Sequence, residues 1–185
     1  MKAKKKILAP IKYQFVLLGD TSVGKSSIYH RLYGKPFIQN NISTIGLEKI
    51  IVNFENVQTD AKGKVTKDFE ITLFDTAGQE RFRSIAKSYF KGSQGIILIY
   101  SIVDKQSFGH IELWLNSIKD SLDDWKKSGY IVMLLGNKLD LANENANNRL
   151  ILAEEAERVC SEKGIYWGGE CSAKESSTEL FIEIL

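Results

Sequence analysis

Residues 13–26, YQFVLLGDTSVGKS, combine a short apolar run with a turn that matches the pattern GxxxxGK[ST] in full. The run YQFVLL predicts a buried strand, and KSSIYHRLYG (25–34) predicts a helix that ends at a glycine. In this pattern the glycines let backbone N–H groups converge on phosphate oxygens, the lysine adds a point charge, and the serine hydroxyl can bind Mg²⁺. The stretch therefore predicts a phosphate-binding loop. The alternative, a strand–helix turn without a ligand, is disfavoured by the strand and helix on either side.

The remaining chain alternates between strand and helix patterns. GLEKIIVNF (46–54) and FEITLF (69–74) alternate in polarity around the turn-like TDAKGK, which predicts a hairpin. GIILIYS (95–101) and YIVMLLG (130–136) are nearly continuous apolar runs, typical of central strands covered on both faces. Helical periodicity covers Gln106 to about Lys127 and residues 149–164, IYWGGE leads into CSAK, and TELFIEIL begins a last helix. The pattern predicts an α/β fold, mostly parallel with one antiparallel hairpin.

Composition excludes several classes of protein. The 185 residues fit one domain, and the two cysteines, Cys160 and Cys171, form no CxxC pair, which excludes a thiolate zinc site. We expect cytosolic thiols, although a disulfide stays possible. No apolar run is long enough to span a membrane.

The first twelve residues form a basic N-terminal extension with five lysines, so the rest of the chain is net acidic. We therefore expect no nucleic-acid partner. The extension itself predicts a solvated terminus, with contact to an anionic membrane as the alternative.

Three further motifs bear on the ligand. Asp75 begins DTAGQE after the second hairpin strand, where a carboxylate is the usual second partner of a phosphate-loop magnesium site; alone, it would more often be a turn residue. In NKLD (137–140) the carboxylate of Asp140 can accept two hydrogen bonds from guanine, a donor pair that adenine lacks. Asn137 can bond the N7 edge of the base, and the stem of Lys138 can cover its ring. Ser172-Ala173-Lys174 would complete the base pocket with a backbone N–H for guanine O6.

With these motifs in order, the sequence resembles the small GTPases of the Ras superfamily, specifically the Rab family, from about Tyr13 to the C-terminus. The Rab-type features are DTAGQERFRSIAKSYFKGSQGIILIYSI and the STIG of residues 43–46. The resemblance implies a P-loop NTPase G domain over residues 13–185, with a truncated last helix. It also implies a six-stranded, mostly parallel sheet with one antiparallel edge hairpin, and about five helices on both faces.

The resemblance also assigns roles to individual residues. Gln79 matches the glutamine that orients the attacking water, and Lys25 contributes to catalysis by neutralising phosphate charge. Thr44 matches the threonine that binds Mg²⁺ only in the GTP state, which gives the metal set Ser26, Thr44 and Asp75. The expected nucleotide-binding residues are Gly19, Asp20, Thr21, Ser22, Val23, Gly24, Lys25, Ser26, Ser27, Phe37, Thr44, Gly78, Asn137, Lys138, Asp140, Ser172, Ala173 and Lys174. Phe37 would be a core aromatic by itself, but its spacing from Ser26 matches the aromatic that packs on guanine.

We therefore expect a Rab-type switch in vesicle and protein transport that binds GTP, hydrolyses it slowly to GDP with Mg²⁺, and acts through effectors. A guanine-nucleotide-binding module with negligible hydrolysis is the alternative; an ATP-dependent kinase or transporter subunit is disfavoured by NKLD and SAK. Expected partners are an exchange factor, a GTPase-activating protein and effectors, which would bind at two switch regions. We expect the protein itself to be a monomer. We expect a cytoplasmic protein whose full-length form reaches membranes through a prenylated tail that this chain lacks.

The chain departs from the Rab pattern in four places. Ser22 replaces a frequent glycine, Lys49 a usual phenylalanine and Phe74 a usual tryptophan, and the hairpin is about eight residues longer by comparison with the family, which predicts a protruding loop over about residues 56–67.

Overall fold

The computed structural model describes residues 9–39, 47–58, 66–76, 90, 92–122, 125–177 and 180. Its centre is a six-stranded sheet in the order β2-β3-β1-β4-β5-β6. Four strand pairs are parallel, and β2 alone among the described strands runs antiparallel, at the edge beside β3. The strands are β1 Ile11–Leu18, β2 Leu47–Gln58, β3 Thr66–Thr76, β4 Gly95–Ser101, β5 Ile131–Asn137 and β6 Tyr166–Glu170. This confirms the mostly parallel α/β sheet with one antiparallel edge hairpin.

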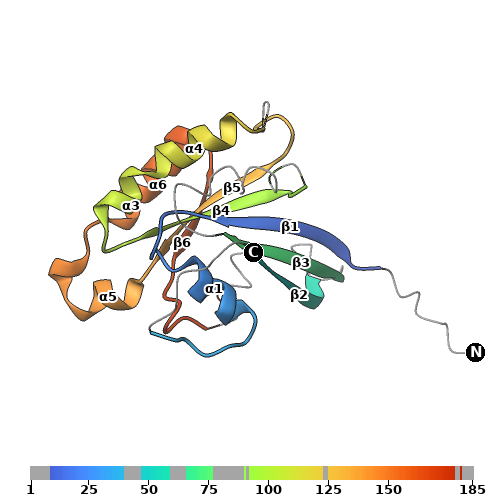
Figure 1. Ribbon diagram of the computed structural model, residues 1–185, viewed down its shortest axis with the longest axis horizontal. Coiled ribbons are helices and arrows are strands. Elements are labelled where there is room, and N and C mark those ends of the chain that lie inside the picture. Colours follow the sequence, from blue (N-terminus) through green and yellow to red (C-terminus); the bar gives the residue numbers. More distant parts are fainter. Residues whose placement is uncertain are drawn as a thin grey trace, which may run out of the picture.

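Helices cover both faces of this sheet. Figure 1 shows α3, α4 and α6 together on one face and α1 on the opposite face. The helices are α1 Lys25–Leu32, α3 Lys105–Gly109, α4 Ile111–Lys119, α5 Leu139–Glu144 and α6 Ala153–Lys163, with a short 3₁₀ helix, η2, at Ala146–Asn148. Within the described ranges no helix combines the length and the apolar character needed to cross a membrane.

The alternation of side chains along the strands divides the core in two. Val16 and Leu18 of β1 pack with α4 and α6, whereas Phe15 and Leu17 pack with α1. This division follows from the two-residue period of a strand, which sends successive side chains to opposite faces. The two cysteines are both buried and free, and they belong to different clusters on opposite faces. The disulfide that the sequence left possible does not form.

The prediction of a single helix over Gln106 to about Lys127 is wrong. The segment forms two short helices that meet at His110, and α4 ends at Lys119. Apolar side chains keep their three- and four-residue spacing across this junction, so periodicity does not reveal the break. The helix predicted over 149–164 also starts later, at Ala153, because the N–H groups of Leu150 and Ile151 both donate to the carbonyl of Ile102.

The two strands of the hairpin extend further towards its turn than predicted. Val57 pairs with Lys67 and Gln58 with Thr66, so both ends of the predicted loop are paired strand; a bulge lies between Phe54 and Val57. Residues 59–65 lie outside the described part of the chain.

Strand β1 begins two residues before its predicted start. Lys12, which the sequence placed in the basic extension, lies in this strand, and its Nζ is 2.9 Å from Oε1 of Glu70 on β3.

Candidate functional site

The phosphate loop joins the C-terminal end of β1 to the start of α1. Gly19 and Gly24 have φ angles of 138° and 98°, a region that side chains disfavour. A Cβ atom at Gly19 would lie 2.1 Å from the carbonyl oxygen of Ile99, and one at Gly24 would lie 2.2 Å from Nδ2 of Asn137. The two motif glycines therefore allow the loop to contact β4 and β5. Ser22 also has a positive φ of 63°, a backbone conformation that non-glycine residues adopt only rarely.

Lys25 lies inside this loop. Its side chain is 5% exposed, and Nζ donates to the carbonyls of Gly19, at 3.0 Å, and Asp20, at 2.7 Å. Burial lowers the pKa of Lys25 to about 8, although the negative charges of Asp75 and Asp20 act in the opposite direction. The ammonium group is thus held against the loop by backbone oxygens and is poorly solvated. A buried cation of this kind can form a strong charge-assisted hydrogen bond with an anionic ligand.

The candidate metal ligands come from two neighbouring elements. Ser26 is the second residue of α1, and the fully buried Asp75 lies near the end of β3, paired with Leu17 in register. The hydroxyl of Thr76 donates to the carbonyl of Leu17 at 2.7 Å, which ties the end of β3 to the strand before the phosphate loop. One hydroxyl and one carboxylate fit Mg²⁺, which prefers oxygen ligands and completes its coordination with water and phosphates. The described residues contain no cluster of three or more His, Cys, Asp or Glu side chains suited to a metal.

Asn137, at the end of β5, joins the phosphate loop to the SAK segment. Its side chain is 1% exposed, with Nδ2 donating to the carbonyl of Val23 at 2.8 Å and Oδ1 accepting from the backbone N–H of Ala173 at 3.0 Å. The sequence assigned this residue to the base alone. In the structure it also holds together two segments that are 150 residues apart in sequence.

Asp140 and Ser172 meet beside this bridge. The hydroxyl of Ser172 donates to Oδ1 of Asp140 at 2.7 Å, and Nζ of Lys174 lies 4.0 Å from Oδ2. Asp140 is 7% exposed, so its hydrogen bond to Ser172 is buried. One carboxylate oxygen is thus oriented by Ser172 and the other faces Lys174. Lys138 precedes α5 with a φ of 71°, and burial lowers its pKa. The structure thus brings NKLD and SAK to one place, and their contacts with a base stay predictions.

For the other predicted site residues, the structure shows only their surroundings or does not describe them. Phe37 is partly buried and packs against the core cluster that contains α1, so its contact with a base stays a prediction. Ser27 is partly buried in the first turn of α1. Thr44, Gly78 and Gln79 lie outside the described residues, and their roles stay predictions.

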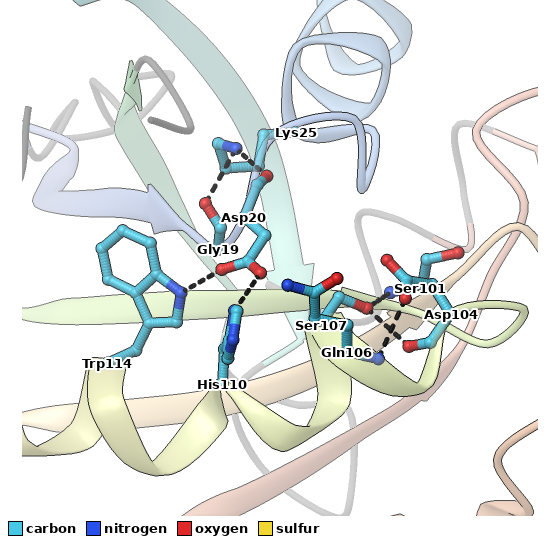
Figure 2. A network of polar contacts seen from close by, with 9 residues as sticks. All are labelled: Gly19, Asp20, Lys25, Ser101, Asp104, Gln106, Ser107, His110 and Trp114. Atoms are coloured by element: carbon cyan, nitrogen blue, oxygen red, sulfur yellow. Dashed lines mark hydrogen bonds and ion pairs between the residues drawn. The ribbon is translucent and has the colours of Figure 1, made fainter. Parts of the chain in front are cut away.

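Two residues that sequence reasoning missed contact the phosphate loop. Figure 2 shows the carboxylate of Asp20 between the side chains of His110 and Trp114, which come from the α3–α4 segment. Oδ1 accepts from the indole N–H of Trp114 at 2.8 Å, and Oδ2 lies 2.5 Å from Nδ1 of His110. A tryptophan at helical spacing predicts core packing, so no local signal marks this contact.

Comparison with known proteins is consistent with this geometry. The Ras family model matches residues 14–185. The chain is 38% identical to GTP-binding protein YPTM1 of Zea mays over 164 residues, which cover 89% of this chain and 71% of that protein. It is 36% identical to Ras-related protein RIC1 of Oryza sativa subsp. japonica, covering 89% of this chain and 73% of that protein. It is 37% identical to Ras-related protein Rab-13 of Mesocricetus auratus, with 89% and 72% covered.

Proposed function

The chain belongs to the Ras family, as a small GTPase of the Rab type, and we propose that its GTP-binding and GTPase activities reside in the pocket around residues 19–27, 137–140 and 172–174. The observation that carries this assignment is the bridge of Asn137, which links the carbonyl of Val23 to the N–H of Ala173. A ligand that contacts all three segments must carry phosphates at one end and a hydrogen-bonding base at the other. GTP and GDP have this form.

The guanine base would be selected by Asp140. A carboxylate accepts hydrogen bonds only, and guanine presents the N1–H and amino donors that match it. The hydroxyl of Ser172 holds one carboxylate oxygen at 2.7 Å and so orients the group before the base arrives. Lys138 would cover the ring, and the SAK backbone would supply the N–H for O6.

The phosphates would be held by the loop N–H groups, the first turn of α1 and Lys25. Ser26, Asp75 and Thr44 are the proposed ligands of Mg²⁺, which when bound neutralises charge on the phosphate oxygens. Lys25 adds a positive charge that its burial leaves poorly screened. Its two backbone acceptors, Gly19 and Asp20, keep Nζ at the loop.

Hydrolysis would depend on Gln79, which orients the attacking water. The remaining alternative is a module that binds guanine nucleotide with negligible hydrolysis. That alternative does not explain the presence of a glutamine at position 79. The experiment that separates the two is single-turnover phosphate release by the GTP-loaded protein, compared with a sample without protein.

The variant Gln79→Leu tests the same assignment more sharply. Leucine has similar bulk but holds no water, so hydrolysis should fall by at least about tenfold, equivalent to ~1.4 kcal/mol of barrier, while GTP affinity changes little. Gln14→Leu, at an exposed position of β1, is the matched control and should hydrolyse GTP at the native rate. Normal hydrolysis by Gln79→Leu would refute the role of Gln79. Absence of phosphate release from the native protein would favour the binding module.

We further propose that an exchange factor, an activating protein and effectors bind at the switch regions. Lys49 is exposed on β2, with Nζ 6.0 Å from the ring centre of Phe74 on β3. The cation covers an aromatic surface that the family usually leaves apolar. We therefore expect effectors of this chain to place an acidic or aromatic group against Lys49.

A further inference from the structure

The carboxylate of Asp20 belongs to the phosphate loop but is turned towards another part of the protein. Figure 2 shows it directed at His110 and Trp114, whereas the ammonium group of Lys25 lies on the other side of the Asp20 backbone. The carbonyl of Asp20 accepts from Nζ of Lys25 at 2.7 Å, so one residue contacts Lys25 through its backbone and the α3–α4 segment through its side chain.

The two donors hold this carboxylate at both of its oxygens. Trp114 Nε1 is 2.8 Å from Oδ1, and His110 Nδ1 is 2.5 Å from Oδ2. An ionised carboxylate only accepts hydrogen bonds, so Nδ1 carries the proton in this contact. The side chains of His110 and Asp20 are 33% and 20% exposed, which leaves the pair partly shielded from water. Hydrogen bonds of this kind, with at least one ionised member, are among the stronger ones in proteins.

The segment that presents His110 is itself fixed to β4. Asp104 caps α3 by accepting from the N–H of Gln106 at 2.9 Å, and its own N–H donates to the carbonyl of Ser101 at 3.0 Å. Ser107 bonds both sides of this turn, since its hydroxyl donates to the carbonyl of Asp104 and accepts from the N–H of Ser101. His110 follows at the junction of α3 and α4, where its carbonyl accepts from the N–H of Trp114 at 3.1 Å. The Asp20 contacts therefore connect the phosphate loop to a rigid turn.

A carboxylate in a loop that binds polyphosphate is unfavourable unless its charge is directed away. We propose that His110 and Trp114 are positioning residues that hold the charge of Asp20 on the α4 side of the loop, and that this arrangement slows the release of bound nucleotide. The inference rests on the proposed phosphate-binding role of residues 19–27. Without the two donors, the carboxylate would be free to turn towards the phosphates. The repulsion should be larger for GTP than for GDP, because GTP carries one more phosphate.

Release of fluorescent GDP and GTP from the full chain, measured by displacement with excess unlabelled nucleotide, tests this proposal. His110→Leu removes the donor and should raise the release rate about tenfold, more for GTP than for GDP. His110→Asn places an amide N–H near the position of Nδ1 and should stay within about twofold of the native rate. Trp114→Phe keeps an aromatic ring but loses the N–H, and should change release in the same direction as His110→Leu.

Combining His110→Leu with a substitution of Asp20 distinguishes the proposed positioning of the carboxylate from a general packing role of His110. In an Asp20→Asn background the charge is gone, so adding His110→Leu should change release by less than about twofold. An equal effect of His110→Leu in both backgrounds, or native release rates for both His110→Leu and Trp114→Phe, would overturn the proposal. His30→Leu, at the other histidine of the chain, is the matched control. Lys25→Ala reports on the site itself: if it retains nucleotide normally, the proposed phosphate site fails, whatever His110 does.

Discussion

Replacing Asn137 should remove the link between the two halves of the proposed nucleotide pocket. Asn137→Ala removes the donor to the Val23 carbonyl and the acceptor for the Ala173 N–H, both in a position that is 1% exposed. Each lost hydrogen bond costs about 1 kcal/mol, and the backbone groups left behind add a desolvation cost, which gives a loss of about 3 kcal/mol in the free energy of unfolding. For a chain of this length, that loss lowers the Tm by about 6–12 °C.

The measurement is thermal and urea unfolding of the nucleotide-free protein, followed by far-UV circular dichroism. Working without nucleotide isolates the protein's own hydrogen bonds from any contact between Asn137 and a base. Asn147→Ala, at an exposed position of η2, is the matched control and should change stability by less than about 0.5 kcal/mol. Asn137→Asp keeps the acceptor for Ala173 but places an oxygen against the Val23 carbonyl, and should destabilise at least as much as alanine. A Tm of Asn137→Ala within about 2 °C of the native value would refute the bridge.

Three other variants probe the base, the metal and the buried lysine. Asp140→Asn should lower GTP affinity by roughly 10–150-fold and raise affinity for xanthosine triphosphate, because the amide presents a donor where the carboxylate accepted; unchanged GTP affinity would contradict the guanine assignment. Ser26→Asn should weaken GTP binding more than GDP binding, since we propose that only the triphosphate state also recruits Thr44, and equal losses with and without excess Mg²⁺ would argue against this coupling. Burial lowers the pKa of Lys25 from 10.5 to about 8, so above pH 8 the unfolded chain holds this proton more tightly than the folded protein does. Its contribution to stability should therefore rise with pH, by about 2 kcal/mol between pH 7.5 and 9.5 in urea unfolding of the nucleotide-free protein, and this rise should be missing from Lys25→Met.

The strands were predictable because their patterns are local. The nearly continuous apolar run of β4 matches the prediction to the residue, at Gly95–Ser101, because a strand buried on both faces needs apolar residues at every position. The edge hairpin was harder, since the polar residues around Gln58 and Thr66 are paired only through the antiparallel partner strand. The helix break at His110 was not predictable, because the apolar spacing continues across the junction of α3 and α4.

The chemistry of the candidate site was equally legible where it depends on residue type and order. A glycine-rich turn ending in Lys25 and Ser26, an aspartate after a strand, and NKLD followed by SAK predict phosphate, magnesium and guanine contacts by their functional groups. The set of chemical groups and the class of fold could therefore be predicted from the order of the residues.

Tertiary structure alone decided how these groups depend on one another. Asn137 bridges Val23 to Ala173, and Asp20 turns to His110 and Trp114, across separations of 114, 36, 90 and 94 residues. No local pattern predicts such contacts, because they arise only when parallel strands bring their C-terminal ends to one edge of the sheet and the loops that follow meet there. Burial then sets their strength, since a hydrogen bond or charge shielded from water is worth more than the same group in solvent.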